Sequence, residues 1–151
     1  ELAEFVRNLF DLNKHGRGYE YDCVTIAYAN SINEFKKLKA YYRAKQYIYI
    51  DYEKSYKDMN ERYKTRQFNA YRYIGKEFDK VLTVIDGKFR YNEYGELVAD
   101  VEDNTDDILE KLLYQGVTRA RDKLCIIVLD NKEVFEKLLE MKSGINREYI
   151  D

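Results

Sequence analysis

The segment Leu124–Leu129 constrains the fold more than any other part of the sequence, because all six of its residues are apolar (Leu-Cys-Ile-Ile-Val-Leu). A strand that faces water on one side alternates apolar and polar residues, whereas a strand without alternation is covered on both faces. Strands of the second kind belong to parallel sheets, which carry helices on both sides. The segment therefore predicts a layered α/β fold with a mostly parallel sheet and helices on both faces.

The rest of the chain alternates between strand-like and helix-like segments, as such a fold requires. Apolar periodicity predicts helices over 2–13, 31–45, 106–120 and 130–142. Further strands are predicted over 23–28, 47–50 and 80–85, with an irregular connection over 51–70. Residues 86–101 predict an inserted β-hairpin that turns at Asn92–Gly95.

Helix starts and core positions follow from the same patterns. Two capping boxes, Ser31 to Glu34 and Asp130 to Glu133, predict the first turns of two helices. Asp106 and Asp107 would stabilise the first turn of another through the helix dipole. Inward positions on the helix over 31–45 are expected at Ile32, Phe35, Leu38 and Tyr42. Cys23 and Cys125 are expected in the strand core.

Length and composition exclude several classes of protein. A chain of 151 residues fits a single domain over 1–151, and no apolar run is long enough to span a membrane. The net charge of -2 excludes a globally basic nucleic-acid-binding surface, although it allows a local basic patch. Two cysteines and one histidine without metal-ligand spacing predict no metal site and fit a reducing, cytoplasmic setting. The start at Glu1-Leu2 and the absence of proline suggest a piece of a longer chain.

Common catalytic motifs are missing from the sequence. It has no G-x-x-x-x-G-K-[ST] or G-x-G-x-x-G phosphate-binding loop and no G-x-S-x-G nucleophile turn. Two segments that each precede a strand carry the remaining candidates for chemistry. One contains Glu77 and the other Thr118, Arg119 and Arg121. A guanidinium is planar and permanently charged, so Arg119 suits a phosphate, but it could equally cap a helix end in water.

The order of these two segments resembles a known family. Ile74-Gly-Lys-Glu-Phe-Asp-Lys-Val81 precedes an apolar strand, and Gln115-Gly-Val-Thr-Arg-Ala-Arg-Asp-Lys-Leu124 precedes another. This order resembles motifs V and VI in the second, C-terminal RecA-like domain of superfamily 1 (UvrD/Rep-like) helicases. It is most similar to the Schlafen-like branch of DNA/RNA helicases. The specific resemblance covers about residues 69–142.

The resemblance implies a nucleotide site shared between two domains. ATP would bind in a cleft whose other wall, a first RecA-like domain, supplies the phosphate loop, the Mg²⁺ ligands and the catalytic acid. By match to motif VI, Arg119 would be an arginine finger on the γ-phosphate, with Thr118 and Arg121 beside the nucleotide. By match to motif V, Glu77 would hydrogen-bond the ribose and Gly75 would allow its close approach.

The segment before motif V implies a contact with single-stranded DNA or RNA. The matching positions are Asn69, Tyr71 and Lys76. Relatives commonly carry Thr or Ser at the first position and His at the second, so the chain departs from the family there. Tyr71 could stack on a base instead, or be a half-buried strand residue.

Three functions therefore remain open at the level of sequence. The first is the C-terminal motor domain of an ATP-dependent helicase or translocase, inactive without its first domain. The alternative is a degenerate, non-catalytic RecA-like module that binds nucleic acid or a protein partner. A stand-alone α/β regulator is a third, weaker reading.

Charge is also unevenly distributed along the chain. Five bases (Lys36, Lys37, Lys39, Arg43 and Lys45) are interleaved with tyrosines 41, 42, 47 and 49. This run could bind a nucleic-acid strand or be a solvated helix face. Between Arg90 and Lys111 there are eight acids and no base, so the hairpin is expected to lie away from any nucleic acid.

Overall fold

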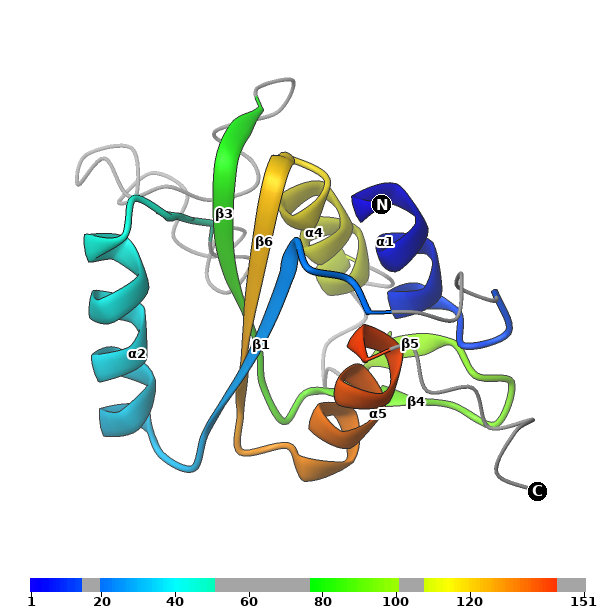
Figure 1. Cartoon of the computed structure of the whole chain (residues 1–151). Coiled ribbons are helices and arrows are strands. Elements are labelled where there is room, and N and C mark those ends of the chain that lie inside the picture. The colour runs from blue at the N-terminus through cyan, green and yellow to red at the C-terminus, as the bar shows by residue number, and fades with distance from the viewer. Residues whose placement is uncertain (15–19, 51–76, 101–107, 144–151) are drawn as a thin grey trace.

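The computed structural model describes residues 1–14, 20–50, 77–100 and 108–143. It is an α/β structure in which helices surround a four-stranded sheet, with a separate two-stranded hairpin (Figure 1). The elements in chain order are α1 (Leu2–Phe10), β1 (Val24–Ala29), α2 (Ile32–Ala44), β2 (Ile48–Tyr49), β3 (Phe78–Ile85), β4 (Phe89–Tyr91), β5 (Leu97–Ala99), α4 (Ile108–Val117), β6 (Ala120–Leu129) and α5 (Lys132–Lys142).

The four-stranded sheet is parallel throughout and has the order β1-β6-β3-β2. Ile126 of β6 is aligned with Ile26 on one side and with Thr83 on the other. The residues from Leu124 to Val128 have no exposed surface, because β6 is an inner strand with helices on both faces. The prediction made from this apolar run is confirmed.

Helices cover the two faces of the sheet unequally. Helix α2 lies on one face, whereas α1, α4 and α5 lie on the other (Figure 1). The larger core joins these three helices to the sheet, with Phe5, Leu113 and Leu138 fully buried in it. The smaller core, under α2, contains Ala29, Tyr47, Leu82, Cys125 and Ile127. No residue of α2 is itself buried, so this helix packs thinly.

The hairpin of β4 and β5 packs on the side of the larger core. Its turn is where the sequence predicts it, because Asn92 Oδ1 accepts hydrogen bonds from the backbone N–H groups of Tyr94 and Glu96, both at 2.9 Å. Gly95 has a φ of 80°, a left-handed conformation that favours glycine. The Tyr91 hydroxyl donates to the Leu9 carbonyl at 2.6 Å, and this bond ties the hairpin to α1.

The predictions of helix starts and of inward positions have mixed outcomes. Ser31 is confirmed as the N-cap of α2, since its hydroxyl accepts from Glu34 N–H at 3.2 Å, but the Glu34 carboxylate accepts from Asn30 N–H instead of closing the box on Ser31. The box at Asp130 is wrong, because Asn131 is the N-cap of α5 and accepts from the Val134 N–H. Ile32 is 56% exposed rather than inward-facing, because it lies at the very start of the thinly packed α2.

The boundaries of several elements also differ from the prediction. Helix α1 ends at Phe10, α4 ends at Val117 instead of continuing to Ala120, and β6 begins at Ala120. The predicted connection over 51–70 and the first-turn aspartates 106 and 107 lie outside the described residues. Among the described helices, none is long and apolar enough to cross a membrane.

Candidate functional site

The candidate site lies at the amino-terminal edge of the parallel sheet. Strands β3 and β6 are neighbours in the same direction, so the segments that precede them meet at one edge. The backbone N–H of Phe78 donates to the Arg119 carbonyl at 2.8 Å, which joins the two segments directly. The parallel pairing therefore brings Glu77 together with the segment from Thr118 to Arg121, although they are about forty residues apart in sequence.

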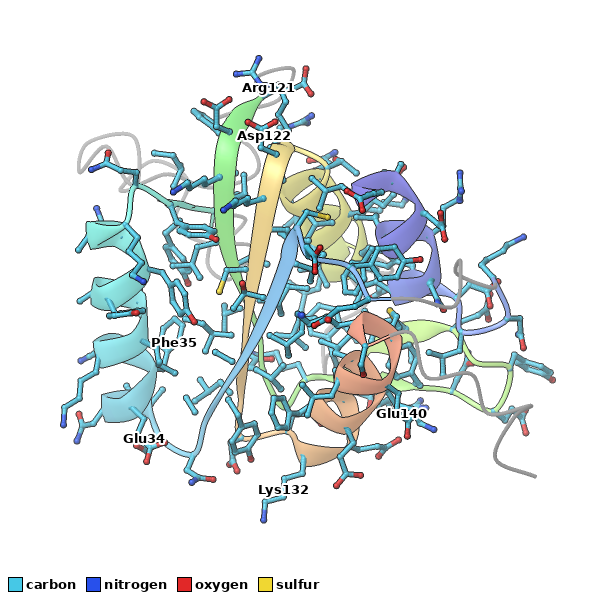
Figure 2. All side chains as sticks on the ribbon, viewed as in Figure 1. Glu34, Phe35, Arg121, Asp122, Lys132 and Glu140 are labelled. Carbon is cyan, nitrogen blue, oxygen red and sulfur yellow. The ribbon has the colours of Figure 1, made fainter. Side chains whose placement is uncertain are left out.

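An ion pair fastens this edge across the two strands. The Arg121 guanidinium donates to Asp79 Oδ1 from Nε at 3.0 Å and from Nη2 at 2.7 Å. This hydrogen bond and the charge of Asp79 raise the pKa of Arg121, and the Glu77 carboxylate acts in the same direction. Figure 2 shows Arg121 and Asp122 at the amino end of β6, at the opposite end of the sheet from Lys132. Because both partners are largely exposed, the pair orients Arg121 more than it stabilises the fold.

Thr118 closes the last turn of α4. Its hydroxyl donates to the carbonyl of Tyr114 at 2.8 Å and approaches the carbonyl of Gln115 at 3.2 Å. The Arg119 N–H then donates to the Gly116 carbonyl at 3.1 Å. These bonds satisfy carbonyls that the end of a helix leaves unpaired, and they turn the chain sharply from α4 into β6. The turn fixes where the Arg119 side chain begins.

Arg119 has a side-chain donor, Nε, that makes no hydrogen bond to the described residues. Its Nε is buried, and within the described ranges it has no hydrogen-bond partner. Gln115 Oε1, from the last turn of α4, is the other buried side-chain polar atom without a partner there. A buried donor or acceptor that lacks a partner costs about 1–3 kcal/mol, so such atoms are rare in folded proteins. The Arg119 Nε is a donor on a permanent cation, so it suits an acceptor on an anionic ligand.

The sequence-predicted site residues fall into two groups. Glu77, Thr118, Arg119 and Arg121 lie together at the amino edge. Gly75, Asn69, Tyr71 and Lys76 lie outside the described residues. Those four predictions stay predictions.

The sequence does not predict what two residues, Asp79 and Gln115, contribute to the candidate site. Asp79 is quoted above only as part of the motif before β3, but it is the partner of Arg121. Gln115 is quoted only as part of a motif, but its side-chain oxygen is buried beside the turn. Periodicity could have found Gln115, because it lies one residue before the buried Gly116 and Val117.

The remaining chemistry-bearing groups of the described residues are the two cysteines and scattered acids. In the described ranges, no cluster of His, Cys, Asp and Glu side chains could hold a metal ion. Cys125 is fully buried, and burial raises the pKa of its thiol to about 12. Cys125 is therefore an unreactive core residue, as the sequence predicts.

No protein-family model matches the chain, and no curated protein or solved structure shows significant similarity to it. We therefore infer the function from the motifs in the sequence and from the geometry of the amino edge.

Proposed function

We propose that this chain is the second RecA-like domain of an ATP-dependent helicase or translocase of superfamily 1. The observation that carries the proposal is the amino edge, where Glu77 and the Thr118–Arg121 segment meet and where Arg119 Nε is buried with no hydrogen-bond partner among the described residues. The parallel sheet with helices on both faces is compatible with a RecA-like fold. The order of the two motif-like segments along the sequence supports the same conclusion.

In this proposal the chain acts on a nucleotide that a first RecA-like domain binds. ATP and Mg²⁺ supply the phosphoryl group and its charge neutralisation, and the phosphate loop and Mg²⁺ ligands belong to that first domain. Arg119 would donate to the γ-phosphate oxygens from across the cleft, because its donor is already desolvated and its charge is permanent. Glu77 would accept a hydrogen bond from a ribose hydroxyl, and Gly75 would leave room for it.

The neighbours of Arg119 would position it. Thr118 sets the turn from which the arginine projects, and the Arg121–Asp79 pair keeps the amino ends of β3 and β6 aligned. Phosphoryl transfer depends mainly on positioning and on charge stabilisation. An arginine supplied in this way increases the turnover rate by roughly 10³- to 10⁵-fold.

The proposed motor also requires a nucleic-acid strand along which it moves. Single-stranded DNA or RNA would contact Asn69, Tyr71 and Lys76, which the family resemblance assigns to the strand. Opening and closing of the cleft during turnover would move the two domains along that strand.

ATP hydrolysis by the longer protein that carries this chain tests the proposal. Turnover is measured with and without single-stranded DNA or RNA, for the wild type, for Arg119→Ala and for Arg90→Ala. Arg90 is the control, because it is an exposed arginine on the hairpin that is paired with Asp100 at 2.7 Å. We expect strand-stimulated turnover that falls at least about 100-fold in Arg119→Ala, with nucleotide binding mostly kept and Arg90→Ala unchanged.

Two other outcomes would overturn it. Wild-type protein without turnover on any strand would favour the degenerate, non-catalytic module. Turnover that does not depend on Arg119 would show that the match to motif VI misassigns the arginine finger. The isolated chain serves as a further control, since it should neither hydrolyse ATP nor bind it tightly.

A further inference from the structure

Helix α2 carries an excess of positive charge with little compensation. Residues 31–50 contain five bases and one acid, Glu34. The Glu34 carboxylate already accepts the Asn30 N–H at 2.7 Å, so it is occupied at the start of the helix. Among the described residues, no ion pair involves Lys36, Lys37 or Arg43. The outer side of α2 is therefore a cationic surface.

Lys39 packs over the Phe35 and Tyr49 rings, but no ion pair or ring contact among the described residues involves Lys36, Lys37 or Arg43. The helix contacts the small core through Phe35, Leu38 and Tyr42, and none of its residues is buried. Figure 2 shows nitrogen-tipped side chains projecting from the outer side of α2. Lys39 and Arg43 are spaced i, i+4, and like charges at this spacing destabilise a helix. An anion bound beside these two cations would reduce this repulsion.

Aromatic rings lie among the cations. Lys45 Nζ is 4.5 Å from the centre of the Tyr41 ring, and the Tyr41 side chain is 51% exposed. Lys37, Tyr41 and Lys45 follow one another at i, i+4 and i+8, which places them about 6 Å apart along one stripe of the helix. The stripe therefore offers an exposed ring between two positive charges.

The same combination continues from α2 onto the adjacent strands. Lys39 Nζ is 4.7 Å from the centre of the Tyr49 ring, and Lys80 Nζ is 5.4 Å from that of Tyr47. Lys80 also donates to the Lys45 carbonyl at 3.1 Å. Positive charge thus extends from α2 to Lys80 near the beginning of β3, whereas the Tyr47 ring is buried in the smaller core.

Negative charge gathers on the other side of the sheet. The hairpin carries Glu93, Glu96 and Asp100, with Arg90 already paired to Asp100. Figure 1 shows the hairpin and α2 on opposite sides of the sheet. A polyanion would be steered towards α2 and repelled from the hairpin.

We propose that the outer face of α2 binds single-stranded nucleic acid. Its phosphates would lie along Lys36, Lys37, Arg43 and Lys45, and a base would stack on Tyr41. An exposed ring can stack only on an unpaired base, so the surface favours a single strand over a duplex. The choice of ligand rests on the proposed function, but the surface can be tested without ATP.

The test is fluorescence anisotropy of labelled oligothymidylate and oligouridylate with the chain, over a series of salt concentrations. The triple variant Lys36→Gln/Lys37→Gln/Arg43→Gln is compared with Lys111→Gln/Lys132→Gln/Lys137→Gln, which removes the same charge from α4 and α5. We expect only the α2 triple variant to lower the salt slope, by about 2, at roughly 0.7 for each lost phosphate contact on a single strand. The two oligonucleotides decide between DNA and RNA.

Tyr41 variants test the stacking. Tyr41→Ala should weaken binding about 5- to 100-fold, whereas Tyr41→Phe should bind like the wild type. Tyr41 is half exposed, and far-ultraviolet circular dichroism checks that the variants keep their helices.

Three results would overturn the inference. They are no binding by the wild type at low salt, equal weakening in both triple variants, and a Tyr41→Ala variant that binds strands and duplex as the wild type does. The last would indicate a surface for any polyanion, including an acidic protein. Failure here is separable from failure of the proposed function. ATP turnover that depends on Arg119 but is unaffected by the α2 triple variant would refute this inference alone.

Discussion

Replacing Arg119 with methionine should stabilise the fold while it removes the proposed function. The Arg119 Nε is buried without a partner in the described structure, which costs about 1–3 kcal/mol. Methionine keeps the apolar stem but has no donor to leave unpaired. The change also removes a cation close to the end of α4, where the helix dipole is worth about 0.3–1 kcal/mol. The net expectation for Arg119→Met is a gain of about 1 kcal/mol in the free energy of unfolding.

Urea denaturation followed by circular dichroism measures this gain. In a thermal melt, the same gain of about 1 kcal/mol corresponds to a rise of roughly 2–4 °C in the melting temperature for a domain of this size. The matched control is Arg121→Met, because it removes an exposed guanidinium from the same edge. Its midpoint should stay near that of the wild type, since an exposed ion pair contributes little.

The opposite result would refute the reasoning. If Arg119→Met lowers the stability by about 1 kcal/mol or more while Arg121→Met does not, then Arg119 supports the fold. The buried donor would then cease to be evidence for a ligand. A stabilised variant that also lacks ATP turnover would fit a residue kept for function at the expense of stability.

Two further predictions concern the hairpin and the core. Gly95→Ala should lower the free energy of unfolding by about 1–2 kcal/mol, because Gly95 has a φ of 80° and a Cβ there would lie 3.3 Å from Asn13 Nδ2; Gly87→Ala, without either feature, should change the urea midpoint little. Stability should fall as the pH rises from 9 towards 12, because burial raises the pKa of Cys125 and of Tyr42 to about 12, so the unfolded chain releases these protons first. Cys125→Ala should flatten that decline, and urea midpoints measured at successive pH values would contradict the assignment if both proteins lost stability equally.

Local patterns predict most of the secondary structure because their signals are contained in a few neighbouring residues. The unbroken apolar run of β6 reports that both faces of the strand are covered, and it does so without reference to any partner. Ser31 with Glu34, and Asn92 with Gly95, likewise satisfy backbone groups within their own turns. Such features are visible in the sequence because the interaction and its cause are adjacent.

Features that depend on distant contacts could not be predicted in this way. Asn131 rather than Asp130 caps α5 because its Nδ2 also donates to the carbonyls of Asp86 and Phe89, at 3.0 and 2.8 Å. Those carbonyls reach Asn131 only after β3 and β6 have paired. The exposure of Ile32 is similar, since periodicity alone cannot show that α2 packs thinly.

The candidate site shows both cases. The sequence identifies Glu77, Thr118, Arg119 and Arg121, but only the pairing of β3 with β6 shows that they share an edge. The same pairing gives Arg121 its partner Asp79, whereas the buried Arg119 Nε has no hydrogen-bond partner within the described ranges. Which arginine is available is therefore a property of the register and not of the motif.

Strand β3 links the proposed nucleotide edge to the proposed nucleic-acid surface. The Phe78 N–H donates to the Arg119 carbonyl. Two residues later, Lys80 Nζ donates to the Lys45 carbonyl at the end of α2. The two contacts are separated by a single residue, Asp79, which itself pairs with Arg121. Any displacement of the amino end of β3 would therefore act on the turn that carries Arg119 and on the stripe of Lys37, Tyr41 and Lys45 together. Two ligands at these two places would both contact the first residues of β3, where the register with β6 is irregular between Phe78 and Lys80.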